Sequence, residues 1–203
     1  MATSPPPNSG SLTLNQAAMQ TAQVRPLTCQ ELEDANEEAR EKETRDSFPG
    51  GAHTTAYRED AAGNGKYMKA MCPNLPKKEF EEGYQDAVTS KKQPPCAGGR
   101  PTSKGRRNDA ENKILHPEMN ARKGGWIRMS THHTATGGGA ADAMPCYSCR
   151  QAICEAEKCG IRVTLCTSKK PPDEISAAKL CKKGKPRGGT ADSDPIWAKA
   201  GLG

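Results

Sequence analysis

Two cysteines separated by two residues constrain this chain more than any other feature. Cys146 and Cys149 follow Pro145 directly. If a helix begins here, the two thiolates lie one turn apart and can bind one metal ion at about 2.3 Å. Proline suits this position because its missing N–H costs nothing before a helix. The partial positive charge of a helix N-terminus favours thiolate over thiol. The spacing therefore predicts half of a zinc site.

The residues after the cysteines continue the pattern of a helix and then of a strand. Cys149, Ala152, Ile153 and Ala156 recur at helical spacing. Gly160 is typical of the residue that ends a helix. The alternation in residues 161–165 predicts a strand.

Composition limits how much of the chain can form a core. The 203 residues are 33% hydrophobic and 4% aromatic, with 20 Gly and 16 Pro. We therefore expect a domain at residues 91–203 and a loosely structured, partly disordered or helical N-terminal extension at residues 1–90. No apolar run is long enough to span a membrane, and the first residues do not read as a signal peptide.

Local patterns place further elements along the chain. Thr28 and Glu31 form a capping-box pattern that opens a helix to about Arg45. Five more segments are expected: a loop at 48–66, a short strand at 66–71, a helix at 77–90, a strand at 126–131 and a helix at 173–183. A helical stretch from Asp109 is interrupted by Pro117.

Positive charge is concentrated on both sides of the cysteine pair. Residues 91–128 carry ten bases and three acids, and residues 169–187 carry seven bases and two acids. Such blocks suit a polyanion such as nucleic acid, although either block alone is typical of solvated surface.

The nine cysteines could form disulfides or bind metal. Their number is odd, no export signal is visible, and five of them fall between Cys146 and Cys166. These observations favour a metal site in a reducing compartment. We expect Cys154, Cys159 and Cys166 to be packed thiols.

A catalytic zinc site needs a third protein ligand and a carboxylate that is free to move protons. Two upstream segments offer both. The segment 116–118 supplies His116 as ligand and Glu118 as proton shuttle, whereas the segment 109–111 supplies Asp109 and Glu111. Ligand chemistry favours His116, because imidazole is the commoner zinc ligand. Topology favours Glu111, because it leaves enough residues for a crossover before the strand at 126. We lean to His116 and Glu118 and keep the other pair as the alternative.

With these motifs, residues 105–183 resemble the cytidine deaminase-like superfamily, and most of all the deaminase domains of bacterial polymorphic toxins. The resemblance implies a three-layer α/β/α fold with a mixed sheet, and Zn²⁺ at the N-termini of two helices. The family also places a strand hairpin before its first half-site. Residues 91–108 offer no convincing strand, so the hairpin could come from 66–72 and the domain could start earlier.

The resemblance implies hydrolytic deamination of a nucleobase in nucleic acid, with cytosine in DNA preferred and RNA as an alternative. Residues expected to contact the substrate are Tyr147, His132, His133, Arg106 and Arg107. The family further implies an effector that is secreted without a cleavable signal peptide, acts in the cytoplasm of a target cell and is neutralised by an immunity protein. Otherwise the protein would be cytoplasmic.

Two other classes remain open. Cys146 and Cys149 could belong to a closed, structural zinc site in a nucleic-acid-binding module. Alternatively, His132 and His133 could serve a metal-dependent nuclease. The first predicts that neither Glu111 nor Glu118 matters for activity, and the second predicts strand cleavage in place of base conversion.

Overall fold

The computed structural model describes residues 25–44, 51–72, 109–121, 124–134, 144–183 and 195–202. In chain order the elements are α2 (Cys29–Thr44), β1 (Gly51–Glu59), β2 (Gly65–Cys72), α3 (Ala110–Ala121), β3 (Gly125–Thr134), α4 (Tyr147–Lys158), β4 (Ile161–Cys166), β5 (Glu174–Ser176), α5 (Ala177–Lys183), α6 (Pro195–Trp197) and a closing π-helical turn (Ala198–Leu202).

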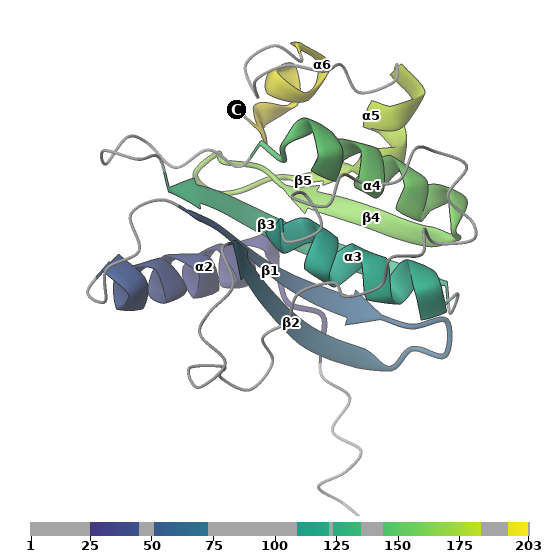
Figure 1. Cartoon of the computed structure of the whole chain (residues 1–203), viewed down its shortest axis with the longest axis horizontal. Coiled ribbons are helices and arrows are strands. Elements are labelled where there is room, and N and C mark those ends of the chain that lie inside the picture. The colour runs from purple at the N-terminus through teal and green to yellow at the C-terminus, as the bar shows by residue number, and fades with distance from the viewer. Residues whose placement is uncertain are drawn as a thin grey trace, which may run out of the picture.

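The five strands form one mixed sheet in the order β2-β1-β3-β4-β5 (Figure 1). β3 and β4 are parallel, and the other neighbouring pairs are antiparallel. A parallel pair needs a crossover connection, which here contains α4. The predicted α/β class with a mixed sheet is confirmed.

The first two strands form a hairpin, although residues 48–66 were expected to be a loop. The predicted strand at 66–71 is confirmed as β2, but residues 51–59 form β1 and pair with both β2 and β3. The turn is held by Asp60, whose Oδ1 accepts hydrogen bonds from the N–H groups of Ala62 and Asn64, both at 2.9 Å. The sheet therefore includes strands from before residue 91, where the domain was expected to begin.

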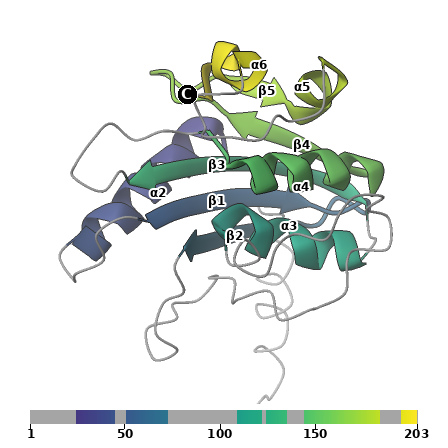
Figure 2. The same cartoon turned by 45° about the horizontal axis from the view of Figure 1, so that its top comes forward.

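Strand alternation divides β3 between the two faces of the sheet. Ile127 and Met129 are buried in the main hydrophobic core together with residues of α3 and α4. On the opposite face, the Ser130 hydroxyl donates to Glu33 of α2 at 2.7 Å. Both views show α2 on one side of the sheet and α3 and α4 on the other (Figures 1 and 2).

Most helix predictions hold, with two changes. The capping box is confirmed, since Glu31 Oε2 accepts from the Thr28 N–H at 2.8 Å and α2 follows. The helix after Cys146 and its end at Gly160, where φ is 77°, are confirmed as well. α3 does not stop at Pro117, which is exposed and lies inside the helix. The predicted helix at 173–183 is shorter, because residues 174–176 add an edge strand to β4.

The predicted helix at 77–90 lies outside the described residues. Within the part of the chain that the structure describes, every helix is too short or too polar to cross a membrane.

The expectation that Cys154, Cys159 and Cys166 are packed thiols is wrong. Cys154 is bonded to Cys181 and Cys166 to Cys29, and Cys159 is in a disulfide too. An odd number of cysteines does not exclude disulfides here, because both chemistries occur together: Cys146 and Cys149 remain thiols. Disulfides persist mainly in oxidising compartments, so this pattern supports exposure to one.

We predict that the Cys29–Cys166 disulfide contributes more to stability than the Cys154–Cys181 disulfide does. It joins residues 137 apart in sequence, whereas Cys154–Cys181 joins residues 27 apart. Replacing Cys29 and Cys166 by alanine should lower the free energy of unfolding by about 2–5 kcal/mol, because the unfolded chain loses the longer of these two loop constraints. Replacing Cys154 and Cys181 should cost less. Denaturant unfolding without reductant measures both losses, and a larger loss for the shorter loop would contradict the prediction.

Candidate metal centre

The site is built where the N-termini of α3 and α4 meet. Asp109 immediately precedes α3, and its carbonyl accepts the first helical hydrogen bond, from Lys113 N at 3.1 Å. Cys146 is the N-cap of α4, and its sulfur accepts from the Cys149 N–H at 3.4 Å. Helix starts carry partial positive charge, which favours anionic carboxylate and thiolate at these positions.

Three side chains converge there at distances that suit one metal ion. Asp109 Oδ2 lies 3.1 Å from Cys146 Sγ and 3.5 Å from Cys149 Sγ, and the two sulfurs are 3.2 Å apart. Asp109 is 8% exposed and Cys149 is fully buried. Tetrahedral zinc with bonds of about 2.0–2.3 Å holds its ligand atoms roughly 3.3–3.8 Å from one another, so a small adjustment accommodates the ion. The donor set of two thiolates and one carboxylate fits zinc.

A second carboxylate stands beside this group. Glu111, in the first turn of α3, is 1% exposed and places Oε2 3.3 Å from Cys149 Sγ. Burial raises the pKa of the Cys149 thiol well above its ordinary value of 9.0, and Cys146 and Glu111 raise it further. A bound cation would offset this cost, so metal uptake should release a proton from Cys149.

The residues first favoured as third ligand and proton shuttle lie elsewhere on α3. His116 is buried seven residues after Asp109, roughly 10 Å further along the helix axis, and is not in the group that could hold an ion. Glu118 is buried and forms ion pairs with Arg58 and Lys66 of the β1–β2 hairpin. The structure therefore brings the alternative pair, Asp109 and Glu111, to the cysteines.

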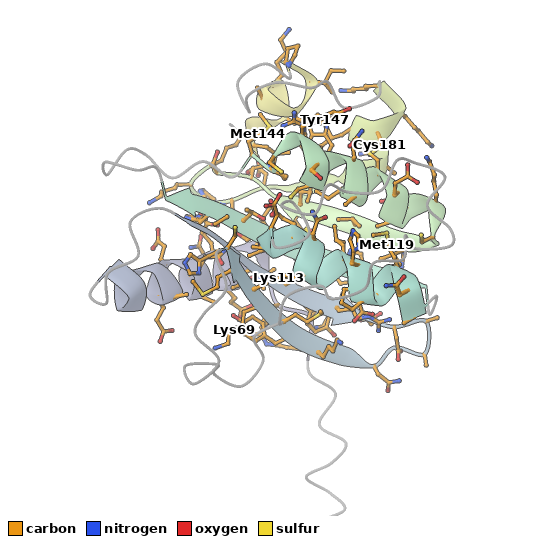
Figure 3. The ribbon with its side chains drawn as sticks, in the orientation of Figure 1. Lys69, Lys113, Met119, Met144, Tyr147 and Cys181 are labelled. Carbon is orange, nitrogen blue, oxygen red and sulfur yellow. A yellow bond between two sulfur atoms is a disulfide. The ribbon has the colours of Figure 1, made fainter. Side chains whose placement is uncertain are left out.

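The predicted substrate contacts are only partly grouped around the site. Tyr147 begins α4, and its hydroxyl accepts from Gln151 Nε2 at 2.8 Å. Figure 3 shows it beside Met144 at the start of that helix. His132 is buried on the face that carries α2, away from the cysteines. The backbone of His133 pairs with Ala52, but its side chain lies outside what the structure describes, as do Arg106 and Arg107.

A buried polar network joins α2 to the sheet. Glu33 accepts from His132 and from the Ser130 hydroxyl, while Asn36 Nδ2 donates to Ser130 Oγ at 3.0 Å. Burial alone would raise the pKa of Glu33, but the hydrogen bonds from His132 and Ser130 outweigh it and hold the pKa below its ordinary value of 4.5.

This network predicts an acid-dependent loss of stability. A carboxylate with a depressed pKa stabilises the folded state above its unfolded pKa, and the effect disappears as pH falls through the folded pKa. Wild-type stability should therefore fall below about pH 5 more steeply than that of Glu33→Gln. Denaturant unfolding between pH 7 and pH 3 compares the two. The two proteins differ at this one side chain, so parallel curves would refute a role for Glu33.

One residue that supports the site was not anticipated. Arg150 is fully buried on α4, and its Nη1 donates to the Pro145 carbonyl at 2.8 Å, directly before Cys146. Its guanidinium lies 6.0 Å from the Trp197 ring of α6. An arginine four residues after a predicted N-cap cysteine is the only sequence signal for it. Arg150 therefore links the turn that carries Cys146 to the C-terminal segment.

Comparison with protein-family profiles, curated proteins and solved structures finds no match to this chain.

Proposed function

We propose that the protein is a zinc-dependent hydrolytic deaminase that acts on a nucleobase in nucleic acid. The observation that carries the proposal is the convergence of Asp109, Cys146 and Cys149 with Glu111 at the facing starts of α3 and α4. The resemblance implies a zinc site at the N-termini of two helices, and this convergence supports that part of the proposal. Three ligands leave a fourth position for water, which a catalytic site requires.

In this proposal Asp109, Cys146 and Cys149 hold the ion, which when bound supplies Lewis acidity toward a water molecule. Glu111 would carry one proton from that water to the ring nitrogen and a second to the exocyclic amine, which then departs as ammonia. Its place two residues after Asp109 fixes its carboxylate beside the ligands. The Arg150 hydrogen bond to Pro145 keeps the turn that carries Cys146 in position.

We propose cytosine in DNA as the first substrate, with RNA as the alternative. Within the described residues, Lys169, Lys170, Lys179, Lys182 and Lys183 supply positive charge near the C-terminus. They would bind phosphates, so binding should weaken as salt increases. The target base must be single-stranded or flipped out to reach a buried site. By resemblance, the biological role is that of a secreted effector with an immunity protein as partner.

One observation favours a second candidate, a closed structural zinc site. Glu111 Oε2 is 3.3 Å from Cys149 Sγ and could complete the tetrahedron, which would leave no place for water. No such observation favours the nuclease hypothesis, because His132 contacts Glu33 on the other face of the sheet and does not approach the cysteines.

Sequencing of treated nucleic acid tests the proposal. Zinc-loaded protein is incubated with single-stranded DNA, double-stranded DNA and RNA, and the products are sequenced. We expect C-to-T or C-to-U changes that disappear in Cys146→Ala. Cys72→Ser is the matched control, since Cys72 is a thiol at the end of β2, outside the group that could hold an ion, and its replacement should retain activity. Zinc binding with unchanged bases would favour the structural site, and strand breaks would favour the nuclease.

A further inference from the structure

The cysteines of this chain exist in two chemical states. Among the described residues, Cys29, Cys154, Cys159, Cys166 and Cys181 are in disulfides. Cys72, Cys146 and Cys149 are thiols. A chain that forms several disulfides encounters oxidants, so its remaining thiols encounter them too.

The pair at the metal centre has the geometry of a dithiol that can close. The sulfurs of Cys146 and Cys149 are 3.2 Å apart, and they occupy the first turn of a helix in a Cys-x-x-Cys arrangement. Such pairs at helix N-termini are typical of redox-active dithiols, because the helix start stabilises the attacking thiolate. Cys146 is half-buried and receives the Cys149 N–H, whereas Cys149 is fully buried. Cys146 is therefore the sulfur that an oxidant can reach.

We propose that Cys146 and Cys149 form a reversible disulfide that excludes the metal, so that the site alternates between an oxidised, metal-free state and a reduced, metal-binding state. The proposal rests on the metal site of the proposed function and concerns its regulation. A disulfide removes both thiolate ligands and leaves the carboxylates of Asp109 and Glu111, which are too few to hold zinc tightly. An exported protein would thus be inactive in an oxidising space and would acquire metal after entering a reducing one.

The step balances with a small-molecule disulfide such as oxidised glutathione. The Cys146 thiolate attacks one sulfur of the oxidant, whose S–S bond breaks, and one small thiolate leaves. Cys149 then transfers its proton to Glu111, whose Oε2 is 3.3 Å away, and attacks the Cys146 sulfur. The second small thiolate departs. Two protein thiols are oxidised, and one small disulfide is reduced to two thiols, which take up the proton that Cys146 lost to solvent and the proton that Cys149 passed to Glu111.

Thiol mapping of the full-length protein tests this switch. Protein freed of metal with a chelator is equilibrated with oxidised and reduced glutathione, its free thiols are alkylated, and the modified peptides are identified by mass spectrometry. We expect Cys146 and Cys149 to lose alkylation together, and Zn²⁺ added first to protect both. In Cys149→Ser, Cys146 should instead carry glutathione. Cys72→Ser is the control, and its Cys146 and Cys149 should behave as in the wild type.

Zinc titration of the oxidised protein completes the test. Its affinity for Zn²⁺ should fall more than about 100-fold and return with reduced glutathione. Cys146 and Cys149 that stay alkylatable in excess oxidant, or an oxidised protein that binds zinc as tightly as the reduced one, would overturn the proposal. Both readouts need no substrate. A protein that switches but leaves every base unchanged would refute the deaminase proposal and retain the switch.

Discussion

Replacing Glu111 with glutamine is expected to reduce base conversion by about 10²–10⁴-fold, the usual contribution of a positioned general acid–base group. Glutamine keeps the size of the side chain but cannot carry the proton. Asp109, Cys146 and Cys149 remain in place, so zinc content should be unchanged. The measurement is the conversion rate per bound zinc ion, together with zinc content by mass spectrometry.

Glu118→Gln is the matched control, since it makes the same change on the same helix. Glu118 contacts Arg58 and Lys66 and does not face the cysteines, so its variant should keep the rate per bound zinc even if it is less stable. Rates are therefore compared at low temperature on folded protein. If Glu118→Gln loses activity and Glu111→Gln keeps it, the assignment of the proton shuttle is reversed. If Glu111→Gln loses its zinc, Glu111 is a ligand and the site is structural.

The sequence predicted two possible pairs of third ligand and proton shuttle, but it did not show which of the two pairs meets the cysteines. Ligand chemistry favoured His116, because imidazole is a commoner zinc ligand than carboxylate. Helix geometry decides otherwise. Cys146 lies at the start of α4, and only a residue at the start of α3 can meet it, which places Asp109 there. The number of residues needed before the strand at 126 favoured Glu111, and this was the correct criterion. The break expected at Pro117 does not occur, because α3 runs through it.

The missed hairpin and disulfides have different causes. Asp60, Gly63 and Asn64 are turn-forming residues, and Thr54, Thr55 and Tyr57 before them have high strand propensity, so β1 could have been predicted. The disulfides could not be. Cys29 and Cys166 are 137 residues apart, and their pairing depends on how α2 crosses the sheet. The residues around each of these two cysteines contain no pattern from which their pairing could be predicted.

The second large effect that we predict is on the free energy of unfolding, and it comes from the ion pairs of Glu118. The side chains of Glu118 and Arg58 are 8% and 7% exposed and contact each other between α3 and β1, while Lys66 Nζ reaches Glu118 Oε1 at 2.9 Å from a side chain that is 53% exposed. A buried charge that loses its partner keeps its desolvation cost without compensation. The two cations differ in exposure, so their contributions should differ as well.

Glu118→Ala should therefore lower the free energy of unfolding by about 3–5 kcal/mol, because it leaves Arg58 buried and unpaired from the carboxylate. Lys66→Ala removes a solvent-screened partner and should cost less than about 1 kcal/mol. Replacing Arg58 and Glu118 together with methionine should recover most of the loss, since no buried charge remains. Denaturant unfolding at neutral pH measures all three variants. Equal losses for Lys66→Ala and Glu118→Ala, or no recovery in the double variant, would show that the buried pair does not determine the stability of this contact.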